Sequence, residues 1–229
     1  MRYSTTLIGA AVMAAMPLFA QAASIHVTGT GTVAVEPDMA VITVGVSEEH
    51  REAGEAMERV STKVASILEA LELAGIAARD VQTQSISVSP VWNNSATDRK
   101  ISGFEASNTV AVRVRVLDSL GYVIDRVLNS GANVMHGLSF RLTDDTEAME
   151  QARRAAVNDA MAKAQVYADA AGVPLGAVTA IDETGSSRGV GRMDMAVSSL
   201  RKEAPVAQGE LVITSTVSMT FDIGADGVE

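Results

Sequence analysis

The sequence predicts an α+β fold in which helices pack on a mixed or antiparallel sheet. Two observations favour this class: apolar residues alternate with period two in several separate runs, whereas two long segments repeat apolar residues at helical spacing. In chain order the predicted elements are β-β-α-β-β-α-β-α-β-β, a mixture of hairpins and crossovers. A doubly wound parallel sheet, which needs a regular alternation of strands and helices, fits this order poorly.

The first two predicted strands lie within residues 25–46 and are separated by a bend at Pro37. A helix is predicted from Arg51 to Ala74, because apolar residues recur there at helical spacing and Gly75 follows where a C-terminal cap would lie. The second strand has an apolar face, typical of a half-buried strand, which consists of Ala40, Ile42, Val44 and Val46.

Two further strands are predicted over residues 81–89 and 108–116. Residues 92–103 between them are polar and rich in Asn and Ser, so we expect a hairpin loop there. In the later strand, Arg113 and Arg115 alternate with valines. We therefore expect both arginines to face water or a partner subunit.

A short helix is predicted over residues 117–129, because Gly131 follows it as a stop signal. The next strand, residues 134–142, has alternating apolar residues. His136 falls on the same predicted face as Leu138, and we expect its side chain to be partly buried.

A long Ala-rich helix follows. Asp144 with Glu147 three residues later resembles a capping box in which Asp144 is the N-cap. Gly172 and Pro174 mark its C-terminal end. The predicted apolar stripe consists of Met149, Ala152, Ala156, Ala160, Ala164, Tyr167 and Ala171.

The C-terminal part predicts a strand over residues 178–182 and a last strand over residues 211–223, where apolar and hydroxyl side chains alternate. Residues 184–208 between them are rich in Gly, Ser, Met and charge, without a clear period. We expect a long mobile loop there.

Residues 1–22 have the features of a cleavable signal peptide. Arg2 supplies the positive charge, residues 7–19 are an apolar run, and Ala20 and Ala22 form a small-x-small cleavage site. The apolar run is shorter than the roughly 20 residues that a membrane-spanning helix needs. The sequence therefore predicts export to the periplasm, a mature domain of residues 23–229, and no integral membrane insertion.

The composition limits the classes of partner that the protein is expected to bind. Loss of Arg2 with the leader changes the net charge from −10 to −11, which disfavours nucleic acid and anionic lipid. The chain has no Cys, so neither a disulfide framework nor a lipid-anchored cysteine is expected. The remaining residues suffice for an aliphatic core, in one domain or in two lobes.

Five collinear blocks carry a family resemblance. They are VTGTGTVAVEPDMAVITVGV at 27–46, ISGFEASNTVAVRVRV at 101–116, GANVMHGLSFRL at 131–142, ARRAAVNDAMAKAQVYADAAGVPLG at 152–176 and GELVITSTVSMTFDI at 209–223. The chain resembles the SIMPL domain family, bacterial periplasmic proteins that include immunogens and proteins linked to oxidative stress. The resemblance implies a periplasmic α+β protein similar to relatives that assemble into large rings or cages. It implies no catalytic residues, and it is weakest over residues 184–208.

Two short motifs resemble known catalytic or cofactor sites. Residues 29–34 read G-x-G-x-x-A, but the sequence after them does not begin a helix, which a dinucleotide site requires. We expect Gly29 and Gly31 to permit a bulge or turn instead. Residues 185–189 read G-x-S-x-G, but no His follows Ser187, as an α/β-hydrolase needs, and a flexible linker has the same composition.

The titratable residues show no site pattern either. His26, His50 and His136 have no metal-binding spacing and no neighbouring Cys. Paired acids lie at the ends of predicted elements, where they cap helices or solvate turns. The sequence therefore assigns no catalytic, cofactor-binding or metal-binding residue and predicts no enzyme activity and no cofactor.

Three hypotheses for function follow. The first is a non-enzymatic envelope protein that self-associates as a homo-oligomer, with strand edges and the Ala-rich helix as interfaces. The second is a binding module whose 92–103 and 184–208 loops contact a peptide, envelope polymer or small molecule. An enzyme with a site formed only in the tertiary structure is the third. The methionines, Met193 and Met195 among them, permit peroxide scavenging, although Met also fills cores that contain few aromatic residues.

Overall fold

The computed structural model describes residues 23–95, 98–190 and 207–223, and it has the α+β class predicted from the sequence. The order of strands and α-helices is also the predicted one. Two 3-10 turns, η1 (Ala78–Asp80) and η2 (Leu117–Ser119), lie between these elements. The elements are β1 (Ser24–Val35), β2 (Met39–His50), α1 (Ala53–Leu73), β3 (Val81–Ser95), β4 (Asp98–Val114), α2 (Leu120–Asn129), β5 (Val134–Arg141), α3 (Thr146–Ala171), β6 (Leu175–Val190) and β7 (Leu211–Ile223).

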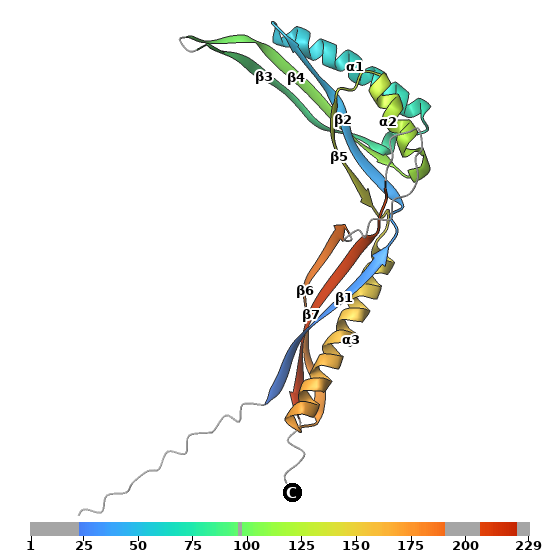
Figure 1. The fold of residues 1–229 in the computed structure, drawn as a ribbon, viewed down its shortest axis with the longest axis vertical. Coiled ribbons are helices and arrows are strands. Elements are labelled where there is room, and N and C mark those ends of the chain that lie inside the picture. The colour runs from blue at the N-terminus through green and yellow to red at the C-terminus, as the bar shows by residue number, and fades with distance from the viewer. Residues whose placement is uncertain (1–22, 96–97, 191–206, 224–229) are drawn as a thin grey trace, which may run out of the picture.

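The strands form two separate antiparallel sheets. Sheet A has the order β1-β7-β6, and sheet B has the order β3-β4-β2-β5. Helix α3 runs along sheet A, and α1 packs on β2 and β4 of sheet B, with α2 beside it (Figure 1). The molecule is elongated and bent, with one sheet in each half (Figure 1).

Two chain segments connect the halves. Residues 36–38 join β1 to β2, and residues 142–145 join β5 to α3. Asp38 ties these segments together: its backbone N–H donates to the Arg141 carbonyl at 3.2 Å, and its Oδ1 accepts the Thr143 N–H at 2.7 Å. The bend at Pro37 therefore carries the chain from one sheet to the other.

The core of sheet B follows the predicted alternation. Ile42 and Val44 of β2 are almost fully buried, as are Val110 and Val112 of β4. Helix α1 covers this face with its own apolar stripe, and burial of each Val, Ile or Leu side chain in the stripe contributes about 1.5–3 kcal/mol. The buried residues of the stripe are Ala56, Val60, Val64, Ile67 and Leu71.

Sheet A packs on α3 through small residues. A Cβ at Gly29 would lie 2.0 Å from the Ala156 carbonyl oxygen, and one at Gly31 would lie 2.1 Å from that of Ala152. Strand β1 pairs with β7 without a register shift, so the predicted bulge or turn at these glycines is wrong. Their role is close approach, because no side chain fits between β1 and the backbone of α3.

The structure differs from the sequence prediction at both ends of α3, in the N-cap residue and in the last residues of the apolar stripe. Asp145, rather than Asp144, is the N-cap and makes no side-chain cap bond; Asp144 Oδ1 instead accepts the Thr146 N–H at 2.9 Å. Tyr167 is 59% exposed and Ala171 is also exposed, because the buried stripe continues at every fourth residue to Ala168, so these two residues lie off it. Gly172 ends the helix in the left-handed conformation, as predicted.

Two predicted loops are strands. Residues 92–95 and 98–103 continue β3 and β4 as a long hairpin, and residues 184–190 belong to β6. Their polar composition suggested loops, but backbone pairing across the strands holds them in extended conformation. Of the second predicted loop, residues 207–208 have no regular secondary structure, as expected for a loop, and residues 191–206 lie outside the described residues.

The predicted signal peptide, residues 1–22, also lies outside the described residues. No helix among the described residues is long and apolar enough to cross a membrane.

Candidate functional site

The sequence motifs do not form catalytic geometry. Residues 185–189 lie inside β6 and pair with β7, whereas a nucleophile elbow needs a sharp turn from a strand into a helix. Residues 29–34 lie inside β1, which is followed by β2 and not by a helix. Neither segment therefore has the surroundings that its motif requires.

The three histidines belong to different places in the fold. His26 contacts Thr220 Oγ1 at 3.0 Å on sheet A, while His50 Nδ1 accepts the Glu52 N–H at 3.2 Å at the end of β2. His136 is exposed and opposes Thr43, so its predicted partial burial is wrong. Gly137, with φ of 62°, forms a bulge that turns His136 away from the core face.

A buried carboxylate of η1 bonds the residue that directly follows β4. Asp80 is 4% exposed, and Arg115 donates to it twice, from Nε at 3.0 Å and from Nη2 at 2.7 Å. These hydrogen bonds lower the pKa of Asp80 against the opposing effect of burial. Arg115 is exposed, as its sequence pattern predicted, and it also bonds a partner within the chain that the pattern did not indicate. Arg113 lies beside it and donates to the Arg79 carbonyl at 3.5 Å.

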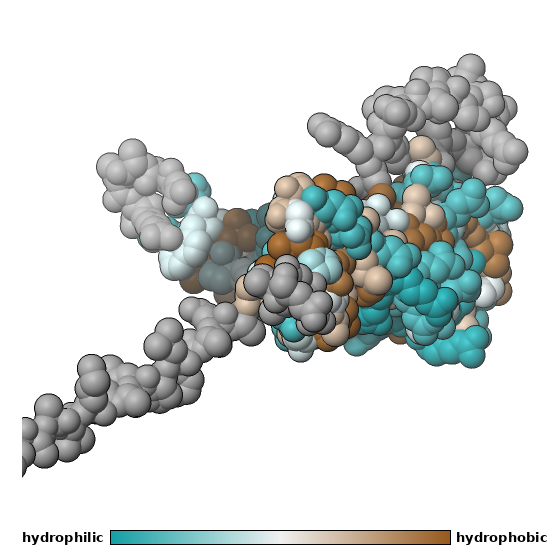
Figure 2. All heavy atoms as spheres, turned by 90° about the horizontal axis from the view of Figure 1, so that it is seen from below, coloured by the Kyte–Doolittle hydropathy of each residue, from teal (hydrophilic) through white to brown (hydrophobic). Residues whose placement is uncertain are grey.

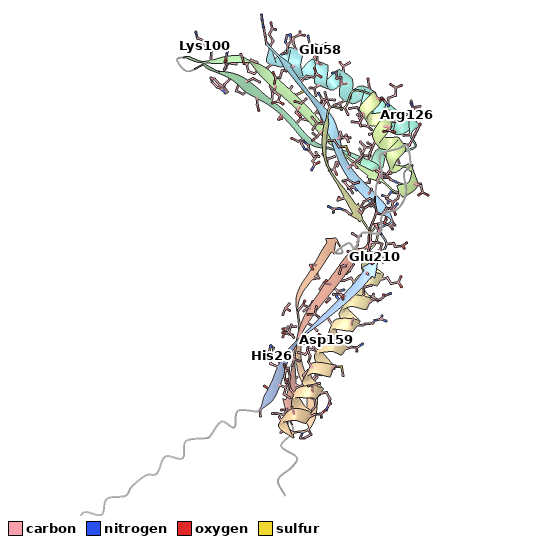
Figure 3. The ribbon with its side chains drawn as sticks, viewed as in Figure 1. His26, Glu58, Lys100, Arg126, Asp159 and Glu210 are labelled. Carbon is pink, nitrogen blue, oxygen red and sulfur yellow. The ribbon has the colours of Figure 1, made fainter. Side chains whose placement is uncertain are left out.

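Polar side chains of α3 cover part of the outer edge of β1. Asp159 Oδ2 accepts the Thr30 N–H at 2.8 Å, and Lys163 Nζ donates to the Thr28 carbonyl at 3.0 Å (Figure 3 labels Asp159). Lys163 also contacts Asp159 at 2.7 Å, and these bonds lower the pKa of Asp159. The middle of this edge is thus occupied within the chain, which opposes its pairing with another strand.

An apolar channel runs between α1 and the edge strand β3. Its base is a groove of about 580 Å³ lined by residues that include Leu68, Leu71, Ile76 and Val81. Towards the hairpin tip, Ile86, Val88 and Trp92 continue it along β3, and Ile101 of β4 opposes Trp92. We call the surface formed by these eight residues the α1–β3 trough.

The trough is open to solvent. Leu68 is 43% exposed, Ile86 59% and Trp92 42%. Helix α1 packs over β2 and β4 and leaves the inner face of β3 uncovered. Exposed apolar residues that are contiguous, rather than scattered, mark interaction sites.

A second apolar area lies on sheet A. Val178 and Ile181 of β6 are 42% and 57% exposed, and they oppose Phe221 and Met219 on the buried face of β7. Helix α3 lies mainly over β1 and β7, so this part of β6 has no cover. Viewed from the lower end of the molecule, apolar side chains reach the surface between polar ones (Figure 2). We call Val178 and Ile181 the β6 patch.

The described residues contain no group of three or more His, Cys, Asp or Glu placed to hold a metal ion. Within the described ranges, the groups with shifted pKa values are Asp80, Arg115, Asp144 and Asp159, and each bonds a structural partner. The candidate functional features are therefore surfaces. Sequence reasoning missed the trough, although alternation in I-x-V-x-P-x-W at 86–92 signals a strand with one apolar face.

Residues 25–221 match the family described as SIMPL, protein of unknown function (DUF541). The chain belongs to this family, which confirms the resemblance drawn from the five sequence blocks.

The similarity to curated proteins agrees with this family membership. The chain is 33% identical over 215 residues to the 26 kDa periplasmic immunogenic protein of Brucella melitensis, covering 89% of this chain and 86% of that protein. The protein of the same name from Brucella abortus matches equally well. The uncharacterized protein YggE of Escherichia coli is 28% identical over 158 residues, 68% of this chain and 64% of that protein. The names of the Brucella proteins agree with the location that the leader predicts.

Proposed function

We propose that the mature chain, residues 23–229, is a periplasmic, non-enzymatic SIMPL-domain protein that self-assembles into a ring- or cage-like oligomer. The observation that carries the proposal is the α1–β3 trough, where several large apolar side chains remain 42–59% exposed. Monomeric proteins rarely leave a contiguous apolar surface of this kind exposed, and this chain is otherwise acidic, with a net charge of −10. Its burial between copies supplies a driving force for association.

A closed ring requires each subunit to contact two neighbours. The trough on sheet B and the β6 patch on sheet A offer two apolar surfaces in different halves of the molecule. Their separation favours a ring or cage over an isolated dimer. The Ala-rich face of α3, an interface in our sequence-based hypothesis, is taken up within the chain, since Ala152, Ala156 and Ala160 are fully buried.

Sedimentation velocity tests this proposal. The mature chain should sediment as one discrete species of many subunits that persists on dilution. Ile181→Glu should reduce the mass because it places a charge in the β6 patch. Val166→Glu is the matched control, since Val166 is 64% exposed on α3 and lies outside both surfaces. A monomer at all concentrations would overturn the proposal.

The alternative is a periplasmic binding module for a peptide, envelope polymer or small molecule. The groove at the base of the trough favours it, because about 580 Å³ accommodates a small ligand. The sequence-based hypothesis also places ligand contacts in residues 184–208, so replacing residues 191–206 with a Gly/Ser sequence of equal length separates the two proposals. Unchanged mass with loss of a peptide-induced rise in Tm favours the binding module, and loss of mass favours assembly.

A role in envelope or oxidative stress tolerance completes the proposal. Met135 and Met161 are 41% and 47% exposed, so hydrogen peroxide can reach their sulfur atoms. Each thioether would take one oxygen atom from peroxide and release water, giving a sulfoxide that methionine sulfoxide reductases reverse. Mass spectrometry after peroxide treatment should find sulfoxide at these two positions before buried Met149 and Met219.

A further inference from the structure

Strand β3 has the residue pattern of a strand with one buried face. Ile86, Val88 and Trp92 alternate along it with Ser85, Ser87 and Ser89. Val88 opposes Ala106, which is fully buried in the core beneath α1. The apolar face of β3 is therefore the helix-covered face of sheet B, continued past the edge of α1.

The chain itself does not supply the burial that this pattern predicts. Val88 remains 43% exposed and Ile101, opposite Trp92, remains 48% exposed. A two-stranded ribbon is marginally stable alone in water, and the outer end of this hairpin extends beyond the last residue of β2, His50, which opposes Phe104. The ribbon is thus a surface that a partner would stabilise.

We propose that a second copy of this chain covers the trough, with Trp92 of each copy seated in the groove beside Leu68 and Val81 of the other. This inference rests on the proposed self-assembly and names one of its contacts. The groove and Trp92 lie on the same face of sheet B, at opposite ends of the trough. A two-fold, antiparallel arrangement therefore fills both grooves at once, as an isologous interface requires.

The charges favour the antiparallel arrangement. Glu69 and Glu72 line the groove at the base of the trough, whereas Lys100 lies near the hairpin tip (Figure 3). Antiparallel packing brings the tip of one copy, with Lys100, over the acidic base of the other. Parallel packing would set the glutamates of both copies against each other, which like charges disfavour.

The edge of β3 is poorly suited to pairing with a strand of another copy. A second copy is therefore expected to pack against the apolar face of β3 instead. Pro90 lacks an N–H, and the register shifts between Thr83 and Ser85 and between Val91 and Trp92. Such irregularities oppose continuous edge-to-edge pairing. The indole of Trp92 is the principal contact, as aromatic residues commonly are at interface centres.

Trp92 is the single tryptophan of the sequence, so its fluorescence reports on this contact. At the same protein concentration, the emission maximum of the mature chain should lie at shorter wavelength than that of the Leu68→Glu variant. Trp92→Ala and Leu68→Glu should each weaken association more than tenfold, as loss of a central contact does. Tyr167→Ala is the control, because this residue is 59% exposed on α3 and far from the trough.

Charge reversal tests the orientation. Lys100→Glu should weaken association, and adding Glu69→Lys and Glu72→Lys to the same chain should restore it. A wild-type chain that stays monomeric would overturn both this inference and the proposed assembly. The inference would also be overturned, with the assembly left standing, by a different result. In that case the wild-type chain is an oligomer, Leu68→Glu changes neither its mass nor its Trp92 emission, and Trp92→Ala leaves its mass unchanged.

Discussion

The packing of α3 on sheet A predicts that Gly31→Ala strongly destabilises the protein. The new Cβ would lie 2.1 Å from the Ala152 carbonyl oxygen and 2.3 Å from the Ala156 nitrogen. Ordinary contact needs more than 3 Å, so α3 would have to move away by more than about 1 Å. Both clashing atoms belong to the backbone, and no rotamer change relieves them. Overpacking of this kind costs about 1–3 kcal/mol, and we expect the upper end of that range.

Thermal unfolding of the mature chain at a fixed concentration, followed by circular dichroism, measures this effect. A loss of about 3 kcal/mol corresponds to a fall in Tm of roughly 6–12 °C for a protein of this size. Gly54→Ala is the matched control, because its Cβ meets nothing within 4 Å in the first turn of α1. That variant should be neutral or slightly stabilised. If Gly31→Ala unfolds within 1 °C of the wild type, the close-approach explanation is refuted.

Two further predictions concern the carboxylates that bond within the chain. Because hydrogen bonds from Arg115 lower the pKa of Asp80 in the folded state, Asp80 adds stability above its unfolded pKa of about 4. This stability is lost as pH falls through the folded pKa. In a plot of the urea midpoint against pH, Asp80→Asn should therefore flatten the limb at acid pH. An unchanged limb would contradict the stabilising role of the Asp80–Arg115 pair. Asp159→Ala should expose the Thr30 N–H and speed hydrogen–deuterium exchange of peptides from β1 on the order of tenfold. Asp169→Ala, on the same helix but bonded to Gln165, should leave that exchange unchanged, and equal effects of both variants would argue against edge protection.

Local patterns predicted most of the fold. Alternation in β2 identified the buried face of Ile42 and Val44, and helical spacing identified the core stripe of α1. Gly172 marked the end of α3 to the residue. These features succeed because they depend on periodicity and capping, which neighbouring residues encode.

Features that depend on tertiary contacts were not predictable in this way. Gly29 and Gly31 predict a bulge or turn because the sequence does not show that α3, more than a hundred residues later, lies against them. Alternation predicts the exposure of Arg115 but not its bond to Asp80, because the two residues are far apart in the chain. Polar composition predicts a loop within residues 92–103, but residues 92–95 and 98–103 are strands, because backbone pairing between distant residues does not depend on an apolar pattern.

The candidate surfaces could not be predicted from the sequence for the same reason. The sequence marks Ile86, Val88 and Trp92 as one face of a strand, but it does not show whether the chain covers that face. Only the position of α1 over β2 and β4 shows that this face of β3 is left open. The earlier proposal of the Ala-rich helix as an interface failed because β1 and β7 already occupy its small-residue face.

The solution mass of residues 23–229 decides whether the protein self-assembles. Sedimentation velocity across a wide range of protein concentration and salt should give one discrete species of many subunits that persists on dilution. A chain that remains a monomer throughout would contradict the proposed self-assembly and would leave the α1–β3 trough as a site for a different partner.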